Sequence, residues 1–117
     1  MKLPCAEKAF VDIEKLRGYC LNPAHERGKN KARLFSSVLG LTEDDAEGVK
    51  TRVLEAARNC EAEVGGEDQY GKRYVIDFTM ATKKGQAKVR STWIIRTHED
   101  FARLTSCYIL KRKDPYK

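Results

Sequence analysis

No stretch of the chain approaches the roughly 18 consecutive apolar residues that a membrane-spanning helix needs. The N-terminal segment MKLPCAEKAF also lacks the apolar region of a signal peptide. We therefore expect a soluble, unprocessed protein of the cytoplasm that makes no membrane contact. The 117 residues, 41% of them apolar, suffice for one hydrophobic core but hardly for two, which predicts a single domain over residues 1–117.

Residues that bind metals or act as nucleophiles are few and scattered. The only histidines are His25 and His98, and neither has a metal-ligand neighbour at the usual spacing; His98 is predicted to be a solvated loop residue. The four cysteines, at positions 5, 20, 60 and 107, stand mostly at apolar positions, which favours reduced core thiols and leaves a disulfide as the alternative. Phosphate-binding glycine loops and hydrolase motifs are missing. We predict no metal and no cofactor.

The charge is unevenly distributed. Residues 1–40 carry eight Lys and Arg against four acids, residues 41–70 three against nine, and residues 71–117 twelve against four, within a net charge of +6. Two basic blocks around an acidic one favour a basic face that meets a polyanion. An ordinary basic surface is the alternative that composition leaves open.

Three helices are predicted in the N-terminal half. Apolar residues recur at helical spacing over residues 6–20. A second helix, short and basic, is expected over residues 30–39, with Gly40 as its C-terminal stop. Thr42 and the three acids after it are typical of a helix start, so a third helix should cover residues 42–60.

The pattern changes to alternation in the C-terminal half, which predicts strands over residues 72–81, 86–96 and 104–110. Because the helices come first and the connections are short, the sheet should be an antiparallel meander with helices on its apolar face. The predicted fold class is α+β, with three N-terminal helices followed by an antiparallel β-meander of three to four strands. The closing segment KRKDPYK should form a basic tail.

A turn at residues 83–85 fixes the register of the first two strands. Tyr74 then lies opposite Trp93 on an apolar face, and Asp77 lies opposite Arg90 on a face that stays partly open. We interpret Trp93 as core, with base stacking as the alternative, and Asp77 as an ion-pair partner and not a general base. The open face carries three cations, Lys88, Arg90 and Arg96, which could bind RNA. An ordinary solvent-exposed face is the alternative.

The segment HERGKNKARLF, residues 25–35, concentrates the residues that could carry chemistry at a predicted helix start, where free amides already favour a phosphate. Metal-free RNA cleavage needs a base for the 2′-hydroxyl, an acid for the leaving 5′-oxygen and cations around the phosphorane. We predict His25 as the proton-transfer group, against the alternative of a solvated basic helix start. The predicted cations are Lys29, Lys31 and Arg33.

Nearly the whole chain resembles a bacterial family of small uncharacterised proteins, through LPCAEKAFVDIEKLRGYCLNPAHERGKNKARLFSSVLGL, YGKRYVIDF, STWIIR and FARLTSCYIL. That family is similar to ribonuclease toxins of the barnase, EndoU, colicin and RelE type of fold. The resemblance implies a metal-independent endoribonuclease of a toxin-antitoxin or polymorphic toxin system, acting on tRNA or ribosomal RNA and neutralised by a small acidic antitoxin or immunity protein. Because the chain begins at the first predicted helix, we expect the free-standing form.

Together with the basic motif and the open face, the resemblance implies two groups of site residues. The predicted catalytic residues are His25, Asn30, Lys31, Arg33, Thr105 and Tyr108. The predicted RNA-binding residues are Arg27, Lys29, Lys88, Arg90, Arg96, Arg103 and Ser106. The family pattern has a histidine where this sequence has Asn30, and asparagine cannot exchange a proton near neutral pH. We therefore expect weakened turnover.

Two other functional classes stay open. A non-catalytic nucleic-acid-binding module is compatible with the charge blocks and is favoured by Asn30. An interaction protein could use the same basic face to hold an acidic partner. In an assay with RNA, cleavage would indicate an enzyme, and retarded but intact RNA would indicate a binding module. The absence of both would favour the interaction protein.

Overall fold

A computed structural model describes residues 1–110, so the predicted basic tail lies outside the described residues. The predicted α+β class is confirmed: helices precede an antiparallel sheet of strand order β1-β2-β3-β4. The helical segments are the 3₁₀ turn η1 (Ala6–Lys8), α1 (Ile13–Lys15), the π-helical turn η2 (Leu16–Cys20), α2 (Lys29–Leu39), the 3₁₀ turn η3 (Glu43–Asp45) and α3 (Ala46–Asn59). The strands are β1 (Glu63–Asp68), β2 (Gly71–Ala81), β3 (Gln86–Arg96) and β4 (Arg103–Ile109).

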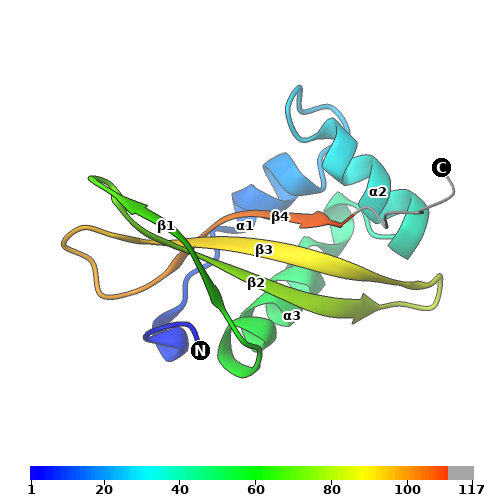
Figure 1. The fold of residues 1–117 in the computed structure, drawn as a ribbon. Helices are drawn as coiled ribbons and strands as arrows, with labels where there is room; N and C mark the ends of the chain where they lie inside the picture. The colour runs from blue at the N-terminus through cyan, green and yellow to red at the C-terminus, as the bar shows by residue number, and fades with distance from the viewer. Residues whose placement is uncertain (111–117) are drawn as a thin grey trace, which may run out of the picture.

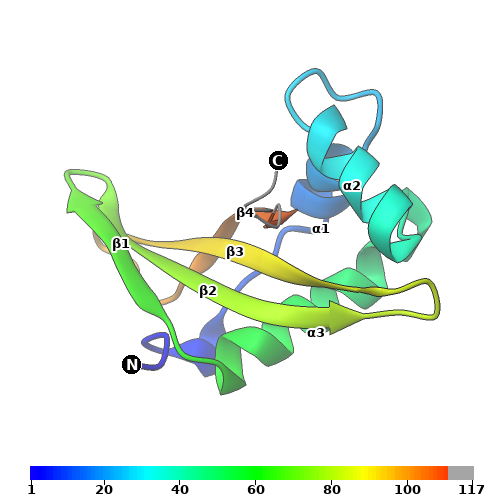
Figure 2. The same ribbon diagram turned by 45° about the vertical axis from the view of Figure 1, so that its right-hand side comes forward.

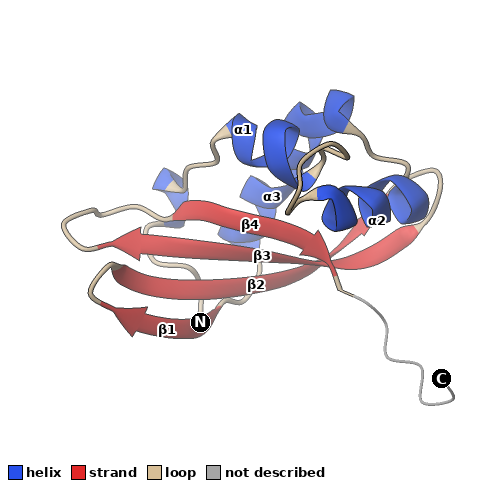
Figure 3. Cartoon of the chain, turned by 90° about the horizontal axis from the view of Figure 1, so that it is seen from above, coloured by secondary structure: helices blue, strands red, loops and turns tan. Residues whose placement is uncertain are grey.

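The sheet forms one layer and the helices form the other. Helix α3 lies behind the sheet, whereas α1 and α2 lie along the β4 side (Figures 1 and 2). Seen from above, the four strands run side by side in chain order, with the helices gathered on one side of them (Figure 3). Within residues 1–110, no helix has the length and apolar character needed to cross a membrane.

The prediction of one continuous helix over residues 6–20 is wrong. The chain is extended between η1 and α1, where Phe10 forms a parallel bridge with Arg103. The Phe10 amide donates to the Ala102 carbonyl at 2.8 Å, and its carbonyl accepts from the Leu104 amide at 3.0 Å. These bonds to the outer side of β4 replace the helical bonds that the apolar spacing predicted, because tertiary pairing overrides a short helical pattern.

The second and third helices are close to their predicted bounds. Gly40 ends α2 in the left-handed conformation (φ 68°), which glycine adopts without steric cost. Thr42 begins the next helical segment as part of a capping box, in which its own amide donates to the Asp45 carboxylate at 2.8 Å. These local signals therefore position both ends of the loop between α2 and α3.

The predicted β2–β3 register is confirmed over the whole hairpin, from Gly71 opposite Arg96 to Ala81 opposite Gln86. Trp93 is fully buried, and its indole N–H donates to the Ser91 hydroxyl at 3.0 Å. That hydroxyl in turn donates to the Ile76 carbonyl at 3.0 Å. The serine in the apolar set thus satisfies the polar atom of the largest core side chain, so the core interpretation of Trp93 is confirmed.

Strand β1 was not located by the alternation pattern. It pairs only with Gly71–Val75, and all six of its residues are exposed. The register shifts between Val64 and Gly66, and Gly66 has a φ of 135°, which is strained for other residues. A short strand with a glycine bulge and no buried face shows no period of two.

The four cysteines are free thiols. Cys20 and Cys107 are buried, and burial raises the pKa of both. Cys5, in contrast, is exposed, so the prediction of core cysteines does not hold for that residue. His98 lies in the exposed connection between β3 and β4, as predicted.

Candidate active site

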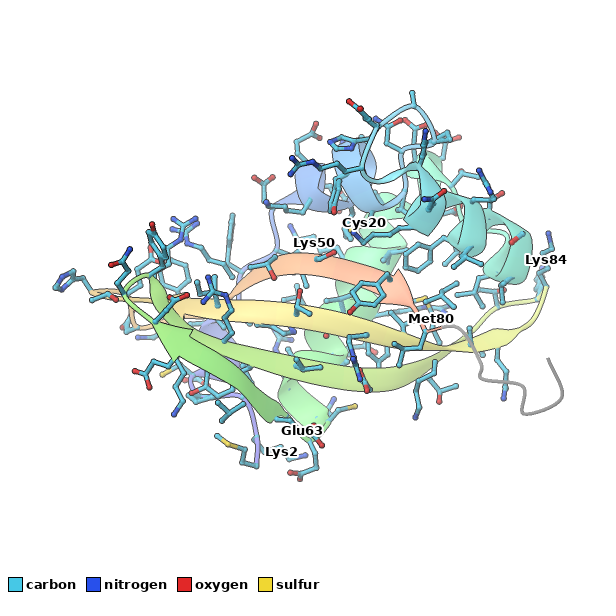
Figure 4. All side chains as sticks on the ribbon, turned by 45° about the horizontal axis from the view of Figure 1, so that its top comes forward. Lys2, Cys20, Lys50, Glu63, Met80 and Lys84 are labelled. Atoms are coloured by element: carbon cyan, nitrogen blue, oxygen red, sulfur yellow. The ribbon has the colours of Figure 1, made fainter. Side chains whose placement is uncertain are left out.

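A groove lies between α2 and the open face of β3 and β4, and we call it the α2–β4 groove. Figure 4 shows side chains rising from these strands toward α2, with Lys84 at the β2–β3 turn beside the end of the helix. Two depressions lie here: Leu34, Lys88 and Ile109 line the larger, of about 880 Å³, and Tyr19, His25 and Thr105 line the smaller, of about 510 Å³. The residues that define the groove are Tyr19, His25, Lys31, Leu34, Lys88, Thr105 and Tyr108.

Lys31 is held at the centre of the groove by two tyrosines. Its ammonium donates to the Tyr19 hydroxyl at 2.6 Å and lies 4.6 Å from the centroid of that ring. It also lies 5.7 Å from the centroid of the Tyr108 ring on β4. A half-buried cation fixed between two aromatic rings interacts with a phosphate more strongly than a solvated lysine does, because less water screens it.

Hydroxyl groups of β3 and β4 lie at and beneath the floor of the groove, and Thr105 lines the smaller depression. The register of β4 shifts between Thr92 and Trp93, which makes Thr105 the extra residue of a bulge. The bulge leaves Leu104 in the core and brings the Thr105 hydroxyl within 2.6 Å of the Thr92 hydroxyl. Ser106 follows, and its buried hydroxyl has no hydrogen-bond partner within residues 1–110.

Arg90 lies opposite Tyr108 on the neighbouring strand, and its guanidinium is held by a carboxylate. Its Nε and Nη2 donate to the two oxygens of Asp77 at 2.8 and 2.9 Å, which confirms the predicted pair. The Arg90 guanidinium holds the pKa of Asp77 below its usual range, and Asp77 in turn raises the pKa of Arg90. This bidentate pair gives Arg90 one orientation beside Tyr108, its neighbour on β4.

His25 anchors the loop before α2. Its Nδ1 accepts the amides of Arg27 and Gly28, both at 3.0 Å, and its ring packs edge-on against Tyr19 with centroids 4.9 Å apart. An accepting Nδ1 means that the neutral ring carries its proton on Nε2. His25 in this arrangement can donate a hydrogen bond from Nε2, but it accepts a proton only by giving up both backbone bonds.

Lys29 and Arg33 do not reach the groove. Residues two apart on a helix differ by about 200° in direction, so Lys31 points away from both of them. Lys29 and Arg33 instead line a separate depression of about 580 Å³, together with Leu21 and Leu41. The basic motif was predicted to act as one cluster, but the structure divides it between the two faces of α2.

Asn30 is exposed in the first turn of α2. It lies one turn before Leu34, and Leu34 lines the larger depression of the groove with Lys88 and Ile109. Position 30 therefore stands at the rim of the groove, and Arg27 lines the smaller depression beside His25.

The remaining predicted RNA contacts lie elsewhere. Arg103 is bonded to Glu99 at 3.0 and 2.7 Å, and its guanidinium lies 4.8 Å from the Phe101 ring centroid. Arg103 holds the pKa of Glu99 low. Arg96 is exposed at the same end of the sheet, away from the β2–β3 turn. These two arginines are thus outside the groove, and Arg103 is engaged in an internal contact.

Tyr19 is the groove residue that sequence reasoning missed. It lies in η2, between two buried positions of the first apolar run, and no spacing marks it as functional. Only the fold brings it beside α2. Within residues 1–110, no three His, Cys, Asp or Glu side chains gather where they could hold a metal ion.

Comparisons with known proteins identify the family of this chain and a solved structure with a similar fold. The family model described as "Domain of unknown function (DUF6883)" matches residues 2–111. A chain of the solved structure "Contact-dependent growth inhibition toxin - immunity protein complex from Klebsiella pneumoniae 342" is similar with a TM-score of 0.68 and 16% identity, over 92% of this chain and 97% of that one. No curated protein sequence matches. At this identity the similarity shows a shared fold.

Proposed function

This chain belongs to the DUF6883 family, and from that premise we propose that it is a metal-independent endoribonuclease toxin whose active site is the α2–β4 groove. The convergence of Lys31, Tyr19, Tyr108 and Thr105 in one groove carries the proposal. A scissile phosphate beside Lys31 would meet one fixed cation and several hydroxyl groups.

The reaction would be attack by the RNA 2′-oxygen on the adjacent phosphorus, with the 2′-hydroxyl proton passing to water. The bond to the 5′-oxygen breaks, which leaves a 2′,3′-cyclic phosphate and a 5′-hydroxyl. Lys31 would neutralise the charge that develops on the phosphorane oxygens. The Tyr19 and Tyr108 hydroxyls would donate hydrogen bonds to the phosphate, and Tyr108 is our candidate for the proton donor to the leaving oxygen.

The groove offers several hydrogen-bond donors, whereas its candidates for a general base are poorly suited to that role. His25 has its Nδ1 committed to two amides, and Asn30 does not titrate. In this proposal His25 positions the loop and donates a hydrogen bond from Nε2, which narrows its predicted role as the proton-transfer group. A slow turnover follows, because a general base contributes about 10²-fold or more to such a reaction.

The toxin part of the proposal is supported by the fold that this chain shares with a chain of a toxin-immunity complex. We propose tRNA or ribosomal RNA as substrate in the cytoplasm, and a small acidic antitoxin or immunity protein as the neutralising partner. Lys88 at the groove and the net charge of +6 favour both kinds of anion.

A second candidate is a non-catalytic RNA-binding protein. The same two observations, the committed Nδ1 of His25 and the asparagine at position 30, favour it, because binding needs cations and hydroxyls but no base.

The test is a cleavage assay on total tRNA and ribosomal RNA, with and without EDTA. We expect discrete fragments that persist in chelator and carry 2′,3′-cyclic phosphate ends. Tyr108→Phe should slow cleavage about tenfold or more. Tyr70→Phe is the matched control, since Tyr70 is 64% exposed at the distant β1–β2 turn. Intact but retarded RNA would favour the binding protein. RNA that is neither cleaved nor retarded would contradict both candidates.

A further inference from the structure

Three neighbouring strands place Asp77, Arg90 and Tyr108 in one row across the open face of the sheet. Arg90 on β3 lies opposite Asp77 on β2 and opposite Tyr108 on β4. Residues directly opposite one another on antiparallel strands have their Cβ atoms about 5 Å apart, so their side chains are neighbours. The Lys31 ammonium lies 5.7 Å from the centroid of the Tyr108 ring, so the row continues into the α2–β4 groove.

The guanidinium of Arg90 has one edge engaged and another edge that Asp77 leaves open. Nε and Nη2 donate to the two oxygens of Asp77 at 2.8 and 2.9 Å. In a planar guanidinium, Nη1 lies on the side away from the edge that Nε and Nη2 form. Nη1 and the second N–H of Nη2 form the open edge, and its two parallel donors match two oxygens of a phosphate.

Asp77 and Tyr108 flank the guanidinium from the two neighbouring strands. Asp77 raises the pKa of Arg90 most, and Tyr108 adds to the rise, which is consistent with close approach on both sides. Because β3 lies between β2 and β4, the side of Arg90 away from Asp77 is the side on which Tyr108 and the groove lie. The pair thus leaves donors of Arg90 available next to the proposed proton donor.

The row is accessible to a ligand but only partly solvated. The side chains of Arg90 and Asp77 are 37% and 33% exposed. Water screens a cation in such surroundings less than it screens a fully exposed one, so the cation acts more strongly on a nearby anion. Arg90 therefore combines an open donor edge with a fixed charge.

Cations outnumber carboxylates around the row. Both oxygens of Asp77 accept from Arg90. Lys88 lies two residues before Arg90 on the same face of β3, and after Arg90 it also lowers the pKa of Asp77. With Lys31 beside Tyr108, three cations accompany one carboxylate, which favours an anion as the occupant.

We propose that Arg90 binds a second phosphate of the RNA, next to the scissile phosphate at Lys31, and that Asp77 is the positioning residue that fixes its guanidinium. Arg90 would donate to two oxygens of that phosphate through its open edge. The RNA backbone would then run from the groove past Tyr108 onto the open face of β3. This inference rests on the proposed function, since it places the neighbouring phosphate of the same RNA.

The sign of one effect distinguishes positioning by Asp77 from simple neutralisation of Arg90. Asp77→Asn removes a negative charge, so neutralisation alone predicts tighter binding of RNA. Positioning predicts weaker binding, because a guanidinium released from the bidentate pair must be ordered when the phosphate binds. We expect the dissociation constant of Asp77→Asn to be about threefold higher than that of the parent.

The experiment measures binding without cleavage. The probe is a short, single-stranded, fluorescein-labelled RNA with a 2′-O-methyl group on every sugar, which removes the attacking hydroxyl. Fluorescence anisotropy gives the association constant over a series of salt concentrations. Arg90→Gln should weaken binding about tenfold and reduce the steepness of log K against log salt by about 0.7, the value for one phosphate contact of a single strand. Arg96→Gln is the matched control, since Arg96 is an exposed arginine of the same strand outside the groove, and its slope should equal that of the parent.

A second measurement on the parent chain does not depend on how a variant folds. A neutral methylphosphonate replaces one phosphate of the probe after another. Binding should weaken at two adjacent positions, one for Lys31 and one for Arg90. The loss at one of the two should disappear in Arg90→Gln and persist in Arg96→Gln. A single sensitive position in the parent would overturn the inference.

Equal affinities and equal salt slopes for Arg90→Gln and the parent would also overturn it, as would tighter binding by Asp77→Asn. Failure of the nuclease proposal gives a different result, in which unmodified RNA is bound with the slope that depends on Arg90 but is not cleaved. A parent chain that binds no RNA would overturn both.

Discussion

The two cationic faces of α2 come from residues only two apart in sequence but have different surroundings. On one face Lys31 is half-buried, bonded to Tyr19 and close to Tyr108. On the other face Lys29 and Arg33 are exposed beside an apolar depression. A cation held among side chains has a defined direction and weak screening, whereas an exposed one has neither. The number of charges in a motif therefore does not say which of them can act on a single phosphate.

The largest expected effect separates these two faces directly. Lys31→Ala should lower kcat/KM for RNA cleavage about 100-fold, because it removes the fixed cation of the groove. Lys29→Ala should lower it less than about threefold, since an exposed charge contributes little. Steady-state cleavage of one defined RNA measures both. Equal losses for the two variants would contradict the division of α2 into an active and a peripheral face.

The second prediction tests how the groove face is held. A Cβ on Gly28 would lie 2.1 Å from the Tyr19 carbonyl oxygen, so Gly28→Ala must push the loop off η2. We expect a loss of about 2–3 kcal/mol in the free energy of unfolding, measured by urea denaturation. Gly48→Ala is the control, since nothing lies within 4 Å of its added Cβ, and it should be neutral or stabilising by up to about 1 kcal/mol. Equal stability of Gly28→Ala and the parent would show that the close packing is dispensable.

The third prediction concerns the rim between the two faces. Asn30→His should increase RNA cleavage about tenfold, because it supplies a titratable group at the groove rim. The rate should rise with pH through the range in which histidine loses its proton. Healthy growth on induction of the variant, with no gain in the cleavage assay, would count against the nuclease proposal.

The smallest expected effect lies on the open face of the sheet, beside the groove. Asp77→Asn should lower the free energy of unfolding by less than about 1 kcal/mol near neutral pH, because the pair with Arg90 is partly solvated. The pKa of Asp77 is lowered in the folded state by Arg90, so the stabilisation is present above the ordinary value of 3.8 and is lost as the pH falls below it. Urea denaturation at pH 7 and pH 3 should show the difference between the two proteins shrinking at the lower pH. A constant difference would rule out this linkage.

Most of the sheet could be predicted from the sequence. The alternation of residues 72–81 and 86–96 and the charges at Asp77 and Arg90 define the β2–β3 register, because one slipped residue would reverse every side chain. The ends of α2 and α3 could be predicted as well, since Gly40 and Thr42 act through local backbone geometry. The break in the first helix could not, because it depends on the bonds of Phe10 to the far end of the chain.

The candidate site could be predicted only in part. The basic segment was named from the residues, and Thr105 and Tyr108 from the family resemblance; Lys31, Thr105 and Tyr108 lie in the groove. Nothing in the sequence separated Lys31 from Lys29, or added Tyr19. Those outcomes depend on how α2 is rotated against η2 and β4.

The sequence alone determined the fold class, the hairpin register and the helix ends, because period, caps and turns act between neighbours in the chain or across one hairpin. Only the tertiary structure decided which cations share a groove, which nitrogen of His25 is committed, and which part of β2 is left without a neighbour. Each of these depends on contacts between segments far apart in sequence, and those contacts form only when the helices pack against the sheet.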